Sequence, residues 1–129
     1  MGMYTEVFFR AELKKDTPTE VLALLGAWVE GRADDMDLPV HPFFECLRWD
    51  TLPGSSSAYF PTGEPSLTRS AWCDQWVLKF HSSLKDYSNE AAKFFDWISP
   101  YTEGYGGEFL GYTLYEESET PTLYHRMAT

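Results

Sequence analysis

The residues of this chain with the most versatile chemistry are its cysteines and histidines, and their spacing indicates no metal site. They are Cys46, Cys73, His41, His81 and His125. Structural zinc sites are built from closely spaced ligand pairs such as C-x2-C. The chain contains no C-x2-C pair, so we predict neither a metal site nor a cofactor.

A cysteine paired in space with His81 or His125 could also act as a nucleophile. Such a cysteine needs a site that stabilises the thiolate, for example a helix N-terminus. Neither Cys46 nor Cys73 precedes a predicted helix, and Cys46 falls in a predicted strand, which is typical of a buried thiol. We therefore predict no catalytic residue and favour a non-enzymatic function, with an unrecognised enzyme as the last alternative.

Carboxylates gather in two segments, at Asp34, Asp35 and Asp37 and at residues 116–119. Both segments fall in predicted loops, where charges are normally solvated. The aspartates lack the glycine and the terminal glutamate of a calcium loop. We predict that they contact a partner protein rather than a metal. DNA mimicry is not favoured, because the acids are scattered along the chain.

The segment 104–107 (GYGG) is rich in glycine, and glycine loops can offer backbone N–H groups to a phosphate. Here the loop follows a helix and leads into a strand, which reverses the order found in nucleotide-binding folds. Nearby aromatic and basic side chains could still bind a small ligand by stacking and charge. This predicted ligand set is Tyr101, Tyr105, Arg69, Lys79 and Lys85.

Trp97 is a second candidate for partner binding. It lies off the apolar face formed by Ala91, Phe94 and Ile98 in a predicted helix. An exposed tryptophan there would suit a dimer or partner contact. The alternative is a helix wedged between the sheet and a loop, with Trp97 buried.

The composition limits the classes of partner that the protein could bind. The chain has 129 residues, a net charge of −10 and 17% aromatic residues. Such an acidic surface disfavours nucleic acid and anionic membranes and suits a basic partner. The N-terminus lacks the basic start and apolar run of a signal peptide, and no segment is long enough to span a membrane. We expect a cytoplasmic protein with reduced thiols.

Periodicity predicts the elements that position these residues. Alternation indicates strands at 4–13, 43–49, 56–60, 66–72, 75–84, 108–115 and 122–127. The spacing of apolar residues indicates two helices. The first begins at a capping box formed by Thr17 and Glu20 and ends at Gly31; the second runs from Ser88 to Ser99. The chain is thus a single α+β domain, residues 1–129, with a mostly antiparallel, ferredoxin-like sheet and two amphipathic helices on one face.

Several segments spread over nearly the whole chain resemble a family of small uncharacterised proteins encoded by phages and prophages. The segments are 3–13 (MYTEVFFRAEL), 16–18 (DTP), 41–44 (HPFF), 83–87 (SLKDY), 92–101 (AKFFDWISPY), 107–112 (GEFLGY) and 121–123 (PTL). No functional residues can be carried over from this family. The resemblance implies a bacterial host and an accessory role, such as host takeover or counter-defence by binding.

Two functional hypotheses follow. The first is a protein that binds and modulates a host protein through a surface of aromatic residues with an acidic rim. The second is a protein that binds or sequesters a small nucleotide-like signal in an aromatic pocket with converging bases. Unpaired sheet edges would also be compatible with a homodimer.

Overall fold

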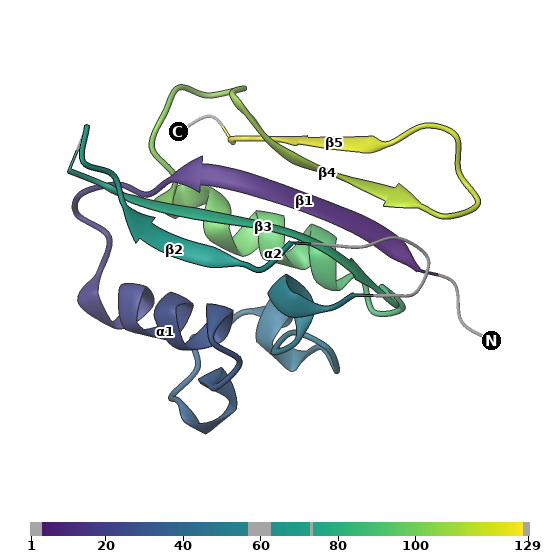
Figure 1. Cartoon of the computed structure of the whole chain (residues 1–129), viewed down its shortest axis with the longest axis horizontal. Helices are drawn as coiled ribbons and strands as arrows, with labels where there is room; N and C mark the ends of the chain where they lie inside the picture. The colour runs from purple at the N-terminus through teal and green to yellow at the C-terminus, as the bar shows by residue number, and fades with distance from the viewer. Residues whose placement is uncertain (1–3, 57–62, 73, 128–129) are drawn as a thin grey trace.

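A five-stranded antiparallel sheet and two helices make up the chain in the computed structural model, which describes residues 4–56, 63–72 and 74–127 (Figure 1). The strands are β1 (Thr5–Glu12), β2 (Ser66–Arg69), β3 (Trp76–Leu84), β4 (Phe109–Tyr115) and β5 (Thr122–His125). The helices are α1 (Thr19–Val29) and α2 (Glu90–Ile98), with short 3₁₀ turns η1 (Ala33–Asp35), η2 (Pro42–Glu45), η3 (Leu52–Gly54) and η4 (Ser99–Tyr101). The predicted α+β class is confirmed.

The strand order places β1 at the centre of the sheet. The order is β2-β3-β1-β4-β5, and neighbouring strands are antiparallel. The chain passes from β1 through α1 to β2, with β3 between the two strands in the sheet. It passes from β3 through α2 to β4, with β1 between them. This split β-α-β arrangement is that of ferredoxin-like folds, and β5 extends it beside β4.

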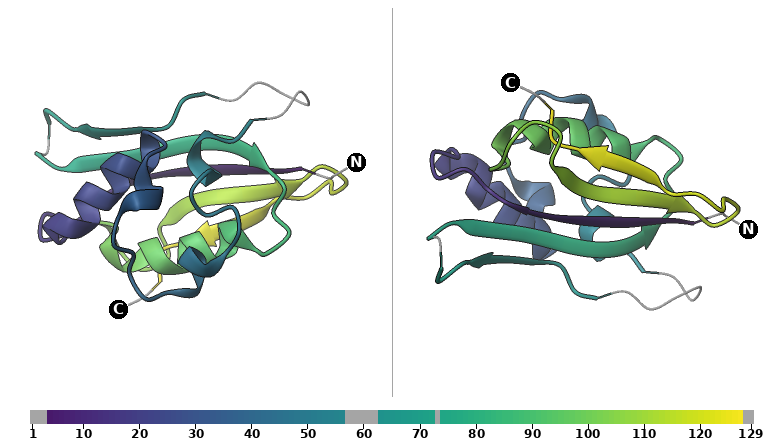
Figure 2. Two further views of the ribbon diagram at one scale, coloured as in Figure 1. Left: turned by 90° about the horizontal axis from the view of Figure 1, so that it is seen from below. Right: turned by 90° about the horizontal axis from the view of Figure 1, so that it is seen from above.

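Both helices cover the same face of the sheet, as predicted (Figure 2). Phe9 of β1 and Phe80 of β3 are register partners, so their side chains project from one face. The Phe9 ring lies 5.1 Å from that of Phe94 in α2, and the Phe80 ring lies 5.5 Å from that of Trp28 in α1. All four side chains are buried. Much of the aromatic content therefore fills the core between the sheet and the helices.

The strand predicted at 43–49 is wrong, because this segment begins with the 3₁₀ turn η2. Pro42 starts the turn, and His41 Nδ1 accepts a hydrogen bond of 3.0 Å from the N–H of Phe43. Phe43 and Phe44 are both buried, whereas adjacent residues of a strand point to opposite faces. Residues 57–60 of the strand predicted at 56–60 lie outside the described residues, as does Cys73.

The helix starts also differ from the prediction. Thr17 donates its hydroxyl hydrogen bond to a carbonyl of the preceding turn, so no capping box forms with Glu20. In α2 the N-cap position is Asn89 rather than Ser88, and its side chain makes no capping hydrogen bond. Asp86 Oδ1 instead accepts a 3.0 Å hydrogen bond from the N–H of Ala91 in the first turn. The sequence located both helices correctly, but neither N-cap side chain makes a capping hydrogen bond.

Candidate functional site

The side chains that point away from the helices form the outer face of the sheet. Leu123, Tyr112, Phe8 and His81 form one row across four of its strands, because each is the register partner of the next. The Phe8 ring stacks on that of Tyr112 at 5.6 Å and meets the His81 ring edge-on at 6.0 Å. No helix of the described chain covers this central row, and Figure 1 shows β1 and β3 in front of α2.

Glu6 holds the central row in place. Its Oε2 atom accepts a 2.6 Å hydrogen bond from the Tyr112 hydroxyl and one of 2.5 Å from His81 Nε2. Burial, with further contributions from the hydrogen bond to Glu6 and its charge, raises the pKa of Tyr112 to about 12. Tyr112 therefore stays protonated at neutral pH and keeps donating. The two hydrogen bonds fix the side chains on either side of the Phe8 ring.

A surface hollow of about 700 Å³ lies at one end of the outer face. Arg10 and Glu12 of β1 and Val77 of β3 contribute to its wall. Residues of the loop 103–108, together with Phe109 at the start of β4, complete it. The hollow therefore adjoins the central row through side chains of the same strands.

Backbone hydrogen bonds hold the loop 103–108 over the sheet. The N–H of Glu103 donates to the carbonyl of Glu12 at 2.8 Å, and the N–H of Gly107 donates to the carbonyl of Arg126 at 2.7 Å. Gly104 has a φ of +137°, a conformation that is essentially restricted to glycine. The glycine-rich segment is therefore a tight loop that backbone hydrogen bonds anchor to the sheet.

Negative charge predominates in the hollow. Three carboxylates line it, those of Glu12, Glu103 and Glu108, against the single guanidinium of Arg10. Across residues 4–56, 63–72 and 74–127, no hydrogen bond or ion pair occupies any of these three carboxylates. The hollow also exposes an aromatic ring, since Tyr105 is 71% accessible to solvent.

Of the two tyrosines predicted to bind a ligand, one lies in the hollow. Tyr105 lines it. Tyr101 belongs to η4, and its ring packs at 5.8 Å against the buried ring of Trp97. The two tyrosines therefore do not form a common stacking surface.

The three predicted ligand bases are spread along β3. Arg69 is the register partner of Trp76, the first residue of β3, and it forms a 2.8 Å ion pair with Asp74. Lys85 follows the last residue of the same strand. Lys79 lies between them on the outer face, opposite Arg10. A strand of this length spans about 30 Å, so the three bases cannot converge on one phosphate.

Trp97, predicted as an exposed partner contact, is buried, with 6% of its surface accessible. Its ring meets that of Phe44 in η2 at 4.9 Å. The wedged helix considered as the alternative is the arrangement found. Asp34 and Asp35 in η1 and the following Asp37 are exposed, which leaves their predicted role as partner contacts open.

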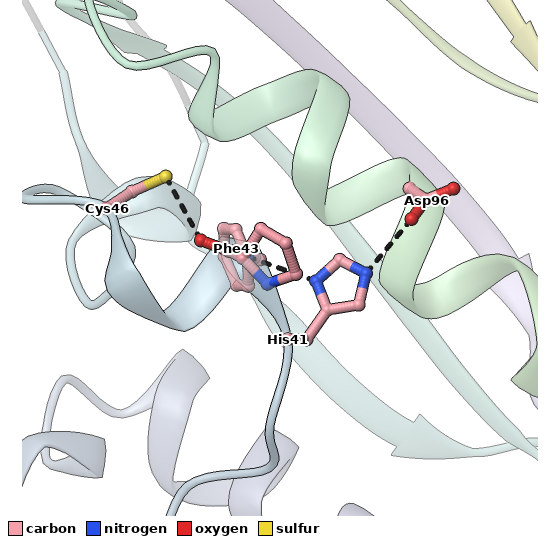
Figure 3. Close-up of polar contacts among 5 residues, drawn as sticks. His41, Phe43, Cys46 and Asp96 are labelled. Carbon is pink, nitrogen blue, oxygen red and sulfur yellow. Dashed lines mark hydrogen bonds and ion pairs between the residues drawn. The ribbon is translucent and has the colours of Figure 1, made fainter.

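Polar contacts of His41 and Cys46, which flank η2, connect this turn to α2 and to the segment before it (Figure 3). His41 Nε2 lies 3.0 Å from Asp96 Oδ2 of α2, which ties η2 to the helix. Cys46 Sγ donates to the carbonyls of Pro42 at 3.5 Å and Ser88 at 3.6 Å. Burial raises the pKa of the Cys46 thiol, so this residue is protonated at neutral pH and is a poor nucleophile.

The cysteine–histidine pairs considered from the sequence do not form around Cys46. His81 is bound to Glu6 on the outer face, and His125 lies edge-on to Phe109 on that face. Cys46 lies on the opposite side of the sheet, beside α2. In the part of the chain that the structure describes, no three potential metal ligands are grouped.

Two acids, the buried Glu90 and the half-buried Asp86, organise the start of α2. Glu90 is fully buried, and its two carboxylate oxygens accept hydrogen bonds of 3.1 Å from the N–H groups of Arg48 and Ser88. The neighbouring Asp86 accepts a hydrogen bond from the N–H of Ala91 in the first turn. Burial, reinforced by the charge of Glu90 and a hydrogen bond to it, raises the pKa of Asp86 to about 6.

This pair predicts that the protein becomes more stable on mild acidification. An unfolded aspartate has a pKa of about 3.9, so between pH 6 and pH 4 the folded state binds the proton first. Relative to Asp86→Asn, the wild type should therefore gain about 1–2 kcal/mol of unfolding free energy from pH 7 to pH 4.5. Urea titrations of both proteins across this range measure the difference. A constant difference would show that Asp86 is not perturbed.

The sequence gives only a weak indication of the residues that form the hollow and the central row. The alternation of β1 placed Glu6, Arg10 and Glu12 together on its polar face, but gave no indication of what lies across the sheet. Tyr112 and His81 come from strands whose pairing with β1 the sequence does not specify. The register of the sheet brings these side chains together.

Comparisons with protein-family models, curated proteins and solved structures found no match to this chain. Among residues 4–56, 63–72 and 74–127, no helix is long and apolar enough to cross a membrane.

Proposed function

We propose that the protein is a non-enzymatic accessory protein of phage type that binds a basic host protein through the outer face of its sheet. The observation that carries this proposal is the largely aromatic central row, with the acidic hollow at one end of the same face, which no described helix covers. Leu123 is 53% exposed and Phe109 46%. Exposed apolar side chains rimmed by charge are typical of protein interfaces.

Charge complementarity supports a basic partner. The chain carries a net charge of −10, and the carboxylates of Glu12, Glu103 and Glu108 outnumber the guanidinium of Arg10 in the hollow. Opposite charge on the partner would accelerate encounter and favour correct orientation. A role in host takeover or counter-defence accords with the phage-type resemblance and with cytoplasmic action.

A nucleotide-like ligand is less well supported. A phosphate needs converging bases or a cradle of N–H groups, whereas the hollow is predominantly acidic and Arg69, Lys79 and Lys85 lie apart. An enzymatic function is also less well supported. The Glu6–His81 pair is the arrangement most like a general acid–base pair, and Glu6 also accepts from Tyr112.

The proposal predicts that a charge placed in the central row weakens binding of the partner strongly. Leu123→Glu puts a carboxylate on the outer face at an exposed position, so the fold should tolerate it while the apolar contact is lost. We expect at least a tenfold loss of affinity, or about 1.4 kcal/mol. Immobilised protein incubated with bacterial lysate, followed by quantitative mass spectrometry of the retained proteins, measures this loss.

Leu47→Glu is the matched control, because Leu47 is 76% exposed and lies beyond η2, on the helix side of the molecule. The partner should be basic, be retained by this variant, and be released as the salt concentration rises. If Leu123→Glu retained the same proteins as the wild type, the outer face would not be the binding surface.

A further inference from the structure

We propose that the hollow receives an arginine side chain of the partner. This inference rests on the proposed function and specifies the group that the partner presents. The hollow combines negative charge with aromatic surface: Glu12, Glu103 and Glu108 line it together with Tyr105 and Phe109. Its volume of about 700 Å³ falls within the range of ligand-binding pockets, and it accommodates an arginine together with some of its flanking backbone.

The chemistry of guanidinium matches these walls better than that of ammonium. A guanidinium is planar, stacks on aromatic faces and forms paired hydrogen bonds with carboxylates. Tyr105 and Phe109 offer rings that are 71% and 46% exposed. The carboxylates have no partner within the described residues, so an incoming cation breaks no internal ion pair.

Arg10, in the wall of the hollow, and the neighbouring Lys79 limit which residues the partner can present next to its arginine. Arg10 and Lys79 are register partners and both are exposed on the outer face. They separate the carboxylates of the hollow from the central row of Phe8 and Tyr112. A second cation would meet these bases, whereas an apolar residue could reach the central row. The partner segment therefore carries one arginine with apolar residues on one side of it, rather than a run of bases.

The test is an NMR titration of the ¹⁵N-labelled protein with acetyl-Gly-Arg-Gly-amide, and with the same peptide containing citrulline. Citrulline has nearly the shape of arginine but no charge. The arginine peptide should shift the amide signals of Gly104, Tyr105 and Gly107 saturably, with a dissociation constant on the order of 1 mM. The citrulline peptide should bind at least about fivefold more weakly, because the ion pairs are lost.

Glutamine variants test whether the carboxylates of the hollow bind the arginine peptide. Glu12→Gln combined with Glu103→Gln should weaken the arginine peptide by at least about fivefold. The control pair, Glu117→Gln with Glu119→Gln, lies in the exposed turn between β4 and β5 and should leave binding unchanged. An unchanged spectrum outside the hollow verifies that the double variant is folded.

Equal binding of the arginine and citrulline peptides, or undiminished binding by the double variant, would overturn the inference. Tighter binding of ethylguanidinium than of the peptide would also overturn it, because the hollow would then be a small-molecule site. If either result occurred while partner capture still depended on Leu123, the proposed function would stand without its arginine contact. If the arginine peptide bound the hollow but Leu123→Glu retained the same lysate proteins as the wild type, the proposed function would fail.

Discussion

Replacing Gly111 with alanine should lower the free energy of unfolding by about 3 kcal/mol or more, the upper range for overpacking. A Cβ atom on Gly111 would lie 1.9 Å from the carbonyl oxygen of Phe8 and 3.0 Å from the Phe95 ring. The first neighbour is backbone of the central strand, so a side-chain rotation cannot relieve the clash. The substitution would force β4 away from β1 at the irregularity between Phe109 and Gly111.

Urea denaturation of the wild type, Gly111→Ala and Gly54→Ala measures this effect. Gly54 is the matched control, because a Cβ atom there would meet nothing within 4 Å and its φ is not positive. Its replacement should change the unfolding free energy by less than about 0.5 kcal/mol, as for most surface substitutions. Equal stability of the two variants would mean that β1 and β4 do not approach as closely as the structure shows.

Replacing Phe94 with alanine should cost about 3–5 kcal/mol, the usual range for a fully buried phenylalanine. Its ring lies 5.0 Å from Trp28, 5.1 Å from Phe9, 5.4 Å from Phe80 and 5.5 Å from Phe43. These partners belong to α1, β1, β3 and η2. Truncating this one side chain would therefore leave a cavity where both helices, the sheet and η2 meet.

Phe109→Ala is the matched control for Phe94→Ala, because it removes the same ring from the outer face, where the side chain is 46% exposed. Thermal unfolding should show a small loss for Phe109→Ala and a large one for Phe94→Ala. Binding should show the opposite preference, since Phe109 lines the hollow. Comparable destabilisation by both variants would contradict the assignment of Phe94 to the core and Phe109 to the surface.

The sequence by itself determined the elements whose patterns are local. The alternation of β1 placed Val7 and Phe9 in the core and Arg10 outside, as the structure confirms. The spacing of Phe94 and Ile98 identified the buried side of α2. The strand predicted from residue 66 is β2, at the edge of the sheet, and the last two predicted strands pair as β4 and β5. In each case the side-chain period of the element decides which residues meet the core.

Local patterns failed where distant segments decide the conformation. The segment 43–49 is predicted as a strand, but the rings of Phe43 and Phe44 both pack against α2. Trp97 lies off the predicted apolar stripe of the helix, which favours an exposed side chain. In the structure it is buried, because Phe44 of η2 packs against it. Thr17 satisfies the sequence pattern of a helix cap, yet its hydroxyl donates to the carbonyl of Lys14 in the preceding turn. Such competing contacts are decided by tertiary packing, which a local pattern does not contain.

The candidate site depends entirely on tertiary structure. Glu6, His81 and Tyr112 are brought together by hydrogen bonds between residues 75 and 106 positions apart in the chain. Glu12 and Glu103 meet at the hollow because a loop folds back over the end of β1. The need for glycine at position 111 arises from the backbone of β1 and from the Phe95 ring of α2, both distant in the chain. Residue types and periods set the faces of each strand, but strand order and register decide which faces become one surface.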